Sequence, residues 1–385
     1  MNKIISVLFA CIFLLSCGSS TQEMTVTIEN PSDFDRVAEL VEIPIDNIIE
    51  KVKLSDSLVY VVKTESGEVI PSQVTYNRLL VFQPQLKAKE AKTFVITKGE
   101  PQQFEAKTYG RFITERKDDF AWENDRVAFR AYGPALIATD GPSNGFDAWY
   151  KRTNNLVIDK WYKNDLAGGE SYHDDHGEGL DDYKVGRTLG AGAMAPYVNG
   201  KLWLNENFAS QEVLENGPLR TTFKLTYKDL DVDGKQIAEN RTISIDAGSQ
   251  LSKVVEAYTI KEPMDVAAGF PKREAGDSII HSNKGYIIYA EPASPKVEGV
   301  FLAMIFPEGM KEMVTDNTYE VTNPTSKQKS TFTHVLGVTT QQPKVPVTYY
   351  TGYGWTKFGF ENLQAFEKYV ENFASALKEP LVIKY

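Results

Sequence analysis

Residues 218–260, "PLRTTFKLTYKDLDVDGKQIAENRTISIDAGSQLSKVVEAYTI", decide the fold class. Apolar and polar side chains alternate in three runs, at residues 218–230, 241–248 and 251–260. This two-residue period is that of a β-strand. The segment "DVDGK" at 231–235 separates two of these runs and has the Asp-Gly pair of a tight hairpin turn. The stretch therefore predicts consecutive antiparallel strands rather than strands alternating with helices.

The same period-two pattern extends in both directions along the 385-residue chain. Short runs fill residues 24 to about 100 and predict a small N-terminal β-sandwich at 24–105, followed by a linker. Longer runs begin near residue 108, and too many strands follow for an immunoglobulin-like unit. We therefore expect a mainly β protein in which residues 106–385 form a large antiparallel double-sheet sandwich with a concave face.

Two segments depart from this pattern. Residues 362–378 have helical spacing, with Leu363, Phe366, Tyr369 and Phe373 on one face, and predict a C-terminal helix. Upstream, the long segment 141–170 is rich in Gly, Asn, Asp and aromatic residues, and within it only "NLVIDKWY" at 155–162 resembles a strand. Long irregular segments of compact domains are usually functional loops.

The N-terminus predicts export. Lys3 precedes a short apolar run that ends in "LLSC" at Cys17, so residues 1–17 resemble a bacterial lipoprotein signal peptide with Cys17 as the lipidated residue. The alternative is an ordinary signal peptide with a chance cysteine. Residues 18–23 then form a tether. Because no acidic cluster follows Cys17, we expect lipid anchoring to a membrane surface that faces the periplasm.

Composition narrows the chemistry. Of the two cysteines, Cys11 lies in the removed signal and Cys17 would carry the lipid, so the mature domain has no thiol for catalysis, metal binding or a disulfide. The formal net charge is −10 and no basic surplus appears, which argues against a nucleic-acid partner. Chemistry must come from His, Tyr, Lys, Arg, Ser and carboxylates.

The strand "RVAFRAY" at 126–132 has an unusual face. Alternation places Arg126, Arg130 and Tyr132 together on one side. Arginine matches carboxylates and sulfates through its planar fork of donors, so this face is a candidate anion-binding surface. The alternative is that both arginines pair with local acids such as Glu123 or Asp125.

The segment "ESYHDDHGEGLDDYKVGR" at 170–187 holds two of the four histidines, His173 and His176. As a metal site, both imidazoles would combine with oxygen from Asp174, Asp175 or Glu178, although the spacing matches no established motif. As an acid–base site, one histidine would move a proton while neighbouring carboxylates tune it. The third interpretation is a solvated acidic loop.

Other aromatic and histidine positions are ambiguous. Tyr349, Tyr353 and Trp355 share one face of the strand 347–355, which suits either a sugar platform or packing within the sheet. His334 shares a strand face with Phe332 and Leu336, which favours a buried structural histidine.

Taken in order, the motifs "ENDRVAFRAYGPA", "GFDAWYKR", "LVIDKWY", "YHDDHGEGLDDYKVGRTLGAGA", "AAGFPKR" and "YTGYGW" resemble a Bacteroidetes family catalogued as a domain of unknown function. The resemblance covers residues 24–385. It implies a galactose-mutarotase-like supersandwich for residues 106–385. It further suggests similarity to the oligosaccharide dehydratases of marine flavobacterial ulvan degradation, which remove water from a non-reducing-end uronate and leave a 4,5-unsaturated sugar.

Such an elimination needs a neutralised carboxylate, a base for the C5 proton and an acid for the leaving 4-hydroxyl. The candidate bases are His173 and His176, and the candidate acids are Tyr172, Tyr183 or the second histidine, with Arg187 or Lys184 as the activating cation. The candidate substrate-binding residues are Arg126, Arg130, Arg152, Lys160, Trp161, Arg187 and Trp355.

The expected partner is a uronate-containing oligosaccharide of the ulvan type. The mechanism requires no cofactor, and a divalent metal is left open. Three alternatives use the same residue types: a lyase that cleaves a uronate glycosidic bond, a mutarotase or epimerase, and a non-catalytic glycan-binding lipoprotein.

Overall fold

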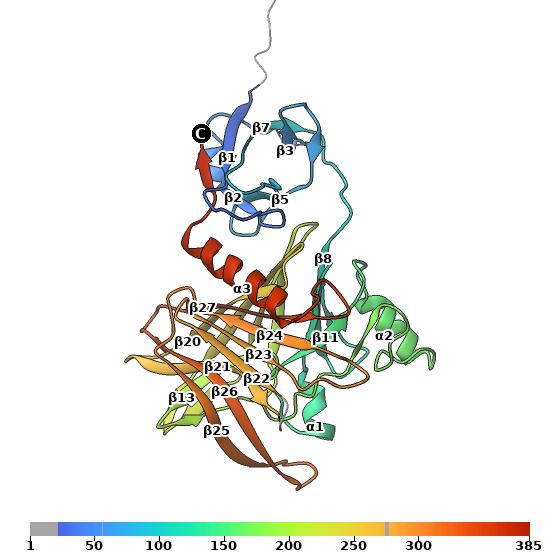
Figure 1. The fold of residues 1–385 in the computed structure, drawn as a ribbon, viewed down its shortest axis with the longest axis vertical. Helices are drawn as coiled ribbons and strands as arrows, with labels where there is room; N and C mark the ends of the chain where they lie inside the picture. The colour runs from blue at the N-terminus through green and yellow to red at the C-terminus, as the bar shows by residue number, and fades with distance from the viewer. Residues whose placement is uncertain (1–21, 56, 274–276) are drawn as a thin grey trace, which may run out of the picture.

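The computed structural model describes residues 22–55, 57–273 and 277–385. The predicted signal peptide and Cys17 lie outside the described residues. Within the described part of the chain, no helix is long and apolar enough to cross a membrane. Two β-rich units are stacked along the long axis of the molecule (Figure 1).

The smaller unit is a sandwich of two antiparallel sheets. One sheet has the order β28-β1-β7-β3-β4, with bounds Val382–Lys384, Met24–Glu29, Ala91–Gly99, Val59–Thr64 and Val69–Ile70. The other has the order β2-β6-β5, with bounds Val41–Pro44, Leu79–Phe82 and Ser72–Val74, and a 3-10 helix η1 at Ile45–Asn47. The alternating apolar positions of these strands, including Val26, Ile28 and Phe82, form its core.

The larger unit is built on an eight-stranded sheet in the order β15-β16-β19-β20-β27-β24-β23-β22. The bounds are Ser210–Asn216, Arg220–Thr226, Glu239–Asp246, Leu251–Tyr258, Val347–Trp355, Val300–Ile305, Tyr286–Ala290 and Ser278–Ser282. The predicted Asp-Gly hairpin joins β17 at Leu230–Val232 to β18 at Lys235–Ile237. Asp233 and Gly234 have φ values of 52° and 80°, as a type I′ turn requires.

Two five-stranded sheets cover the inner face of this sheet. The first has the order β12-β11-β10-β9-β8, with bounds Gly179–Asp181, Phe146–Lys151, Ala128–Ala131, Asp119–Asn124 and Thr108–Ile113. The second has the order β14-β13-β21-β26-β25, with bounds Lys201–Leu202, Met194–Val198, Met264–Lys272, Lys329–Gln341 and Glu312–Thr322. A 3-10 helix η2 at Pro134–Leu136 and α1 at Ile137–Asp140 follow β10. The predicted mainly β, double-sheet architecture is confirmed.

A single aromatic and aliphatic core joins the three sheets of the larger unit. Phe120 of β9 stacks on Phe223 of β16 at 4.0 Å between ring centroids, and Phe270 of β21 stacks on Tyr289 of β23 at 6.3 Å. Both five-stranded sheets thus pack on the same face of the eight-stranded sheet. His334 is fully buried beside this core, as predicted.

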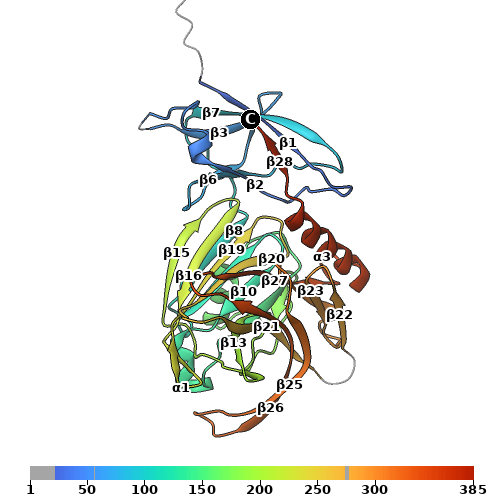
Figure 2. The same ribbon diagram turned by 90° about the vertical axis from the view of Figure 1, so that its left-hand side faces the viewer.

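The predicted C-terminal helix is α3 at Leu363–Lys378. The side chain of Asn362 accepts a hydrogen bond from the Ala365 amide and caps its first turn. Its buried face, formed by Phe366, Val370 and Ala374, covers the outer face of β23 and β24. The chain then crosses to the smaller unit, where β28 pairs with β1 (Figures 1 and 2).

The interpretation of residues 155–162 as a strand was wrong, because residues Ile158–Leu166 form helix α2. A short apolar run cannot be assigned to strand or helix by its period alone. Here a side chain distant in the sequence favours the helix. The buried Glu123 carboxylate accepts hydrogen bonds from the amides of Val157 and Ile158, at 2.8 Å each, at the start of the helix. The helix lies on the outer face of the β8–β12 sheet.

Candidate acid–base site

Four neighbouring strands place charged side chains on the outer face of the β8–β12 sheet. Asp119 comes from β9, Arg130 from β10, Asp147 from β11 and Asp181 from β12. Their neighbours along each strand, such as Phe120 and Phe129, point into the core. Since side chains alternate between faces, these four charges converge beneath α2 and the histidine-rich loop.

Arg130 is the centre of this cluster and only 3% exposed. Its Nε donates to Asp147 Oδ2 at 3.0 Å, and its Nη2 donates to Asp181 Oδ2 at 2.9 Å. Asp119 Oδ2 lies 3.9 Å from Nη1. The Tyr132 ring centroid lies 4.9 Å from the guanidinium carbon. Arg130 is therefore already saturated by three carboxylates of the protein itself.

Arg116 supplies the second cation of the cluster. Its Nη1 lies 3.6 Å from Asp119 Oδ2, and its Nε donates to the Tyr172 hydroxyl at 2.9 Å. Two guanidinium groups thus face three carboxylates. Burial, reinforced by the charge of Asp181, raises the pKa of Asp147 to about 7. Burial therefore favours the protonated form of one carboxyl within the coupled Asp147–Asp181 pair.

Aromatic rings wall the cluster on the side of α2. Tyr172, which is 3% exposed, stacks on Trp149 with centroids 5.1 Å apart, and Trp161 stacks on Trp149 at 5.4 Å. Among the described residues, neither the Tyr162 hydroxyl nor the Trp149 Nε1 has a hydrogen-bond partner. Unpaired polar atoms in a buried wall are unusual and often mark a functional site.

His173 lies at the mouth of the cluster, with 54% of its side chain exposed. Its Nδ1 is 3.1 Å from the Asp181 carbonyl oxygen and 3.6 Å from Asp181 Oδ2. A carbonyl oxygen can only accept a hydrogen bond, so Nδ1 must carry the proton. In the neutral ring this leaves the lone pair on Nε2, which forms no hydrogen bond to another described residue. The imidazole is thus oriented as a base facing outward.

His176 has the opposite orientation and is also exposed. Its Nε2 is 3.1 Å from the Ser171 carbonyl oxygen. A cavity of about 20 Å³ beside it is lined in part by Trp161, Tyr172 and Lys160. Such a space holds about one water molecule and no sugar ring. Across residues 22–55, 57–273 and 277–385, no three His, Cys, Asp or Glu side chains gather as a metal site would require.

Two of the predicted substrate-binding cations, Arg152 and Lys160, form ion pairs with carboxylates of the histidine-rich loop. Arg152 Nε lies 2.9 Å from Asp175 Oδ2, and Lys160 Nζ lies 2.8 Å from Glu178 Oε2. These ion pairs link the loop to the end of β11 and to α2. Both cations remain partly exposed and close to the histidines, but each already has a carboxylate partner.

Tyr183 and Arg187 lie away from His173. Tyr183 is buried, and the cation against its ring is Arg273, whose guanidinium carbon is 5.2 Å from the ring centroid, rather than Arg187 or Lys184. Arg187 donates to the Leu204 carbonyl oxygen at 2.7 Å. The structure therefore does not bring the predicted acid Tyr183 and its predicted cation together.

Arg126 and Trp355 also lie apart from the cluster. Trp355 is 1% exposed and its Nε1 donates to the Val297 carbonyl oxygen, so it packs within the sandwich and offers no surface to a sugar. Arg126 precedes β10 and lies 3.5 Å from Asn154 Oδ1 through Nη1. The prediction that it shares a face with Arg130 fails because the strand begins only at Ala128.

Sequence reasoning missed the three aspartates. For Asp119 and Asp147 the signal is present in the alternation of two short runs, "DDFAWEN" at 118–124 and "FDAWYK" at 146–151. In each run an acid falls on the face opposite the aromatic core residues. A strand that is buried on both faces and carries an acid must find a cation for it, and here that cation is Arg130.

The fold and the cluster define a two-unit β-sandwich protein with a buried charged network under a histidine-bearing loop. The chain belongs to the family described as "Domain of unknown function (DUF4861)", whose model matches residues 28–383. It is 31% identical to "Uncharacterized protein P7" of Formosa agariphila, over 100% of this chain and 99% of that protein.

Among solved structures, the chain is similar to an alpha-mannosidase from Enterococcus faecalis, with a TM-score of 0.51 and 9% sequence identity. The match covers 94% of this chain and 46% of the mannosidase, so the chain spans about half the length of that protein. A glycosyl hydrolase family 38 protein from the same organism matches with a TM-score of 0.49 and 10% identity. At this identity the mannosidase likeness shows the fold alone.

Proposed function

We propose that this protein is a carbohydrate-active β-elimination enzyme, a dehydratase that removes water from the non-reducing-end uronate of ulvan-type oligosaccharides. The observation that carries the proposal is His173, whose Nδ1 is held by the Asp181 carbonyl so that Nε2 faces outward as a base. A general base needs this orientation and access to the substrate proton.

His173 removes the C5 proton, the C4–C5 double bond forms, and the C4–O bond breaks with its electron pair on oxygen. The oxygen takes a proton and leaves as water. We assign that proton to solvent water at the open side of His173, because the Tyr172 hydroxyl is buried in the cluster, where it accepts hydrogen bonds from Arg116 and Arg130.

The substrate carboxylate needs a cation that the protein has not already neutralised. Arg130 is saturated, so the clamp must come from the mouth of the site. Lys184 meets this condition, because it is exposed and forms no ion pair with another described residue. Lys296, whose Nζ donates to the His173 carbonyl oxygen at 2.9 Å, is already paired with Asp182 Oδ1 at 3.0 Å.

Because the adjacent cavity is too small for a sugar ring, the uronate must rest against the open side of His173. An exposed site of this kind suits the end of a short oligosaccharide. We place the enzyme in the periplasm, lipid-anchored through Cys17, where oligosaccharides released from a polymer would reach it. Its proposed partners are these glycans and the membrane surface, and nucleic acid is not among them.

The test is incubation of the purified protein with rhamnose–glucuronate oligosaccharides, followed by mass spectrometry and ultraviolet absorbance. We expect the loss of one water and the absorbance of a conjugated alkene. His173→Ala should lower the rate by about 10²–10⁴-fold, as loss of a general base does. His281→Ala, at an exposed histidine of β22, is the matched control and should keep the wild-type rate.

The alternatives give different products. Cleavage of a glycosidic bond indicates a lyase, isomers of unchanged mass indicate a mutarotase or epimerase, and binding without any product indicates a glycan-binding protein. Unchanged substrate mass with a flat absorbance trace would remove the elimination proposal altogether.

A further inference from the structure

A second cavity lies outside the histidine site, where the two units meet. It has a volume of about 560 Å³ and is bordered by residues 34–42 of the smaller unit, the outer face of the eight-stranded sheet, and α3 with the segment that follows it. Cavities of about 300–1,000 Å³ are the size that binds small molecules. None of its lining residues belongs to the His173 site.

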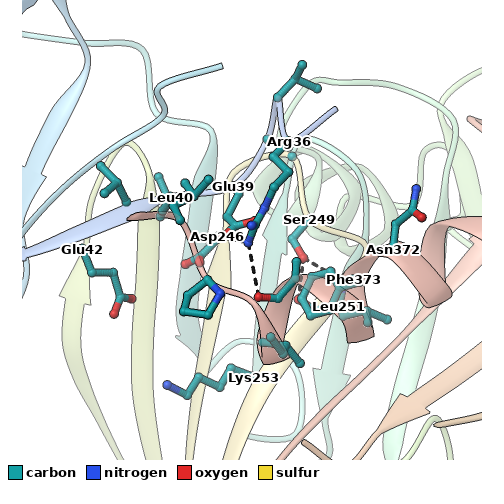
Figure 3. A pocket seen from close by; sticks show the side chains of 18 of the residues that line it. Arg36, Glu39, Leu40, Glu42, Asp246, Ser249, Leu251, Lys253, Asn372 and Phe373 are labelled. Atoms are coloured by element: carbon teal, nitrogen blue, oxygen red, sulfur yellow. Dashed lines mark hydrogen bonds and ion pairs between the residues drawn. The ribbon is translucent and has the colours of Figure 1, made fainter. Parts of the chain in front are cut away.

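The walls combine aromatic and aliphatic surfaces from different parts of the chain. Tyr350 of β27 and Phe373 of α3 meet edge to face at 5.3 Å between ring centroids. Leu40, Leu251 and Leu381 add aliphatic surface from the smaller unit, the sheet and the C-terminal segment. Figure 3 shows Leu40, Leu251 and Phe373 around the same space. Such walls can receive the apolar face of a ring.

The charged groups of the lining neutralise one another. Arg36 binds both oxygens of Glu39 at 2.6 Å each, and its Nη1 donates to the Glu379 carbonyl oxygen at 2.8 Å. Arg220 binds Asp246 through Nε at 2.6 Å and Glu42 through Nη1 at 2.6 Å. These ion pairs leave hydrogen-bonding groups in the cavity wall, but because each pair is neutral they create no strong electrostatic field there.

The balance of charge disfavours an anionic ligand. Four carboxylates line the cavity, from Asp35, Glu39, Glu42 and Asp246, against three cations, from Arg36, Arg220 and Lys253. Of these cations only Lys253 forms no ion pair with another described residue. A uronate or a sulfated sugar would meet a surface with a net negative charge and a single unpaired cation, Lys253, and could engage either arginine only by removing a carboxylate from it.

We propose that this inter-unit cavity is a second ligand site, which binds a neutral saccharide unit. Aromatic rings beside charge-compensated hydrogen-bonding groups suit a sugar ring, which has an apolar face and a polar rim. A bound sugar touches both units and therefore stabilises their relative placement. The site is separate from His173 and does not depend on the elimination chemistry.

The test uses rhamnose, a neutral deoxyhexose, with glucuronate as the charged comparison, and isothermal titration calorimetry on the full mature chain. We expect saturable rhamnose binding and at least tenfold weaker glucuronate binding. Ala376→Trp places an indole in the cavity and should weaken rhamnose binding at least tenfold. Ala365→Trp, at an exposed position of the same helix outside the cavity, should leave it unchanged.

Two further variants keep the inference falsifiable if Ala376→Trp folds poorly. Tyr350→Ala removes the ring of the wall and should also weaken rhamnose binding, whereas His173→Ala should not. Absence of saturable rhamnose binding overturns the proposal, as does binding that survives both cavity variants or disappears with His173→Ala. Binding that persists in a protein inactive on uronates supports this site while rejecting the elimination.

Discussion

At the scale of single residues, the protein is defined by buried charges that have partners on other strands. Arg130 lies between three aspartates, and each comes from a different strand of one sheet. Burying such groups is unfavourable unless every charge is paired or neutralised. With two guanidinium groups for three carboxylates, burial raises the pKa of the coupled Asp147 and Asp181 carboxyls, that of Asp147 to about 7.

Asp147 should make the stability of the protein depend on pH. Its folded-state pKa of about 7 lies above the unfolded value of about 3.9, so the folded state binds this proton more tightly. Its stabilising contribution is complete below about pH 4 and is lost as the pH rises through about 7. Asp147→Asn cannot ionise, so wild type should lose stability relative to this variant over that range, by at most about 1.4 kcal/mol per pH unit.

Urea unfolding of both proteins between pH 4.5 and 8 measures this difference. Asp229→Asn, at an exposed aspartate, serves as the control and should show a difference that barely changes over the range. A parallel pH dependence in wild type and Asp147→Asn would mean that the proton resides elsewhere in the cluster.

At the scale of elements, α2 is held in place by a buried ion pair rather than by its own sequence. Glu123 of β9 accepts the first amides of the helix and pairs with Lys151 Nζ at 2.7 Å. Lys151 also donates to the Asn124 carbonyl oxygen at 2.6 Å. The helix carries Trp161 and Tyr162, so this pair fixes the aromatic wall beside Tyr172.

Breaking this pair should destabilise the protein strongly. Glu123→Gln leaves the Lys151 ammonium buried without a carboxylate, and Lys151→Met leaves the carboxylate without its cation. Each should cost about 3–5 kcal/mol in the free energy of unfolding. The double variant should cost less than the sum of the two, because no uncompensated charge remains.

Urea unfolding of the two single variants and the double variant gives the coupling energy. Lys329→Met breaks an exposed pair with Glu320 and should change stability by no more than about 1 kcal/mol. Additive effects of Glu123→Gln and Lys151→Met would show that the pair is not what fixes α2.

At the scale of the whole molecule, the C-terminal end of the chain returns to the N-terminal unit. The C-terminal strand β28 completes the sheet of the N-terminal unit, and Leu381 and Ile383 pack against its core. The prediction that residues 106–385 form one unit therefore missed that the last strand belongs with the first. The helix α3 and this return strand also border the inter-unit cavity.

Deleting residues 381–385 should destabilise the smaller unit more than the larger one. The deletion turns β1 into an exposed edge and removes the pairs Thr27↔Lys384, Ile28↔Ile383 and Glu29↔Val382. Hydrogen exchange should accelerate at β1 and remain slow in β16 and β19 of the larger unit. Tyr385→Ala keeps β28 and should leave exchange at β1 slow. Unchanged protection of β1 in the deletion variant would contradict this role for the strand.

The sequence by itself determined the strand-rich fold, the Asp-Gly hairpin and the C-terminal helix, because alternation, turn chemistry and helical spacing are local signals. It also singled out Tyr172, His173 and Arg130, which the structure brings together. Tertiary structure alone decided that α2 is a helix, that Trp355 and Tyr183 are buried, and that Asp119, Asp147 and Asp181 converge on Arg130. These outcomes depend on pairing between strands distant in sequence, and a local pattern carries no information about such partners.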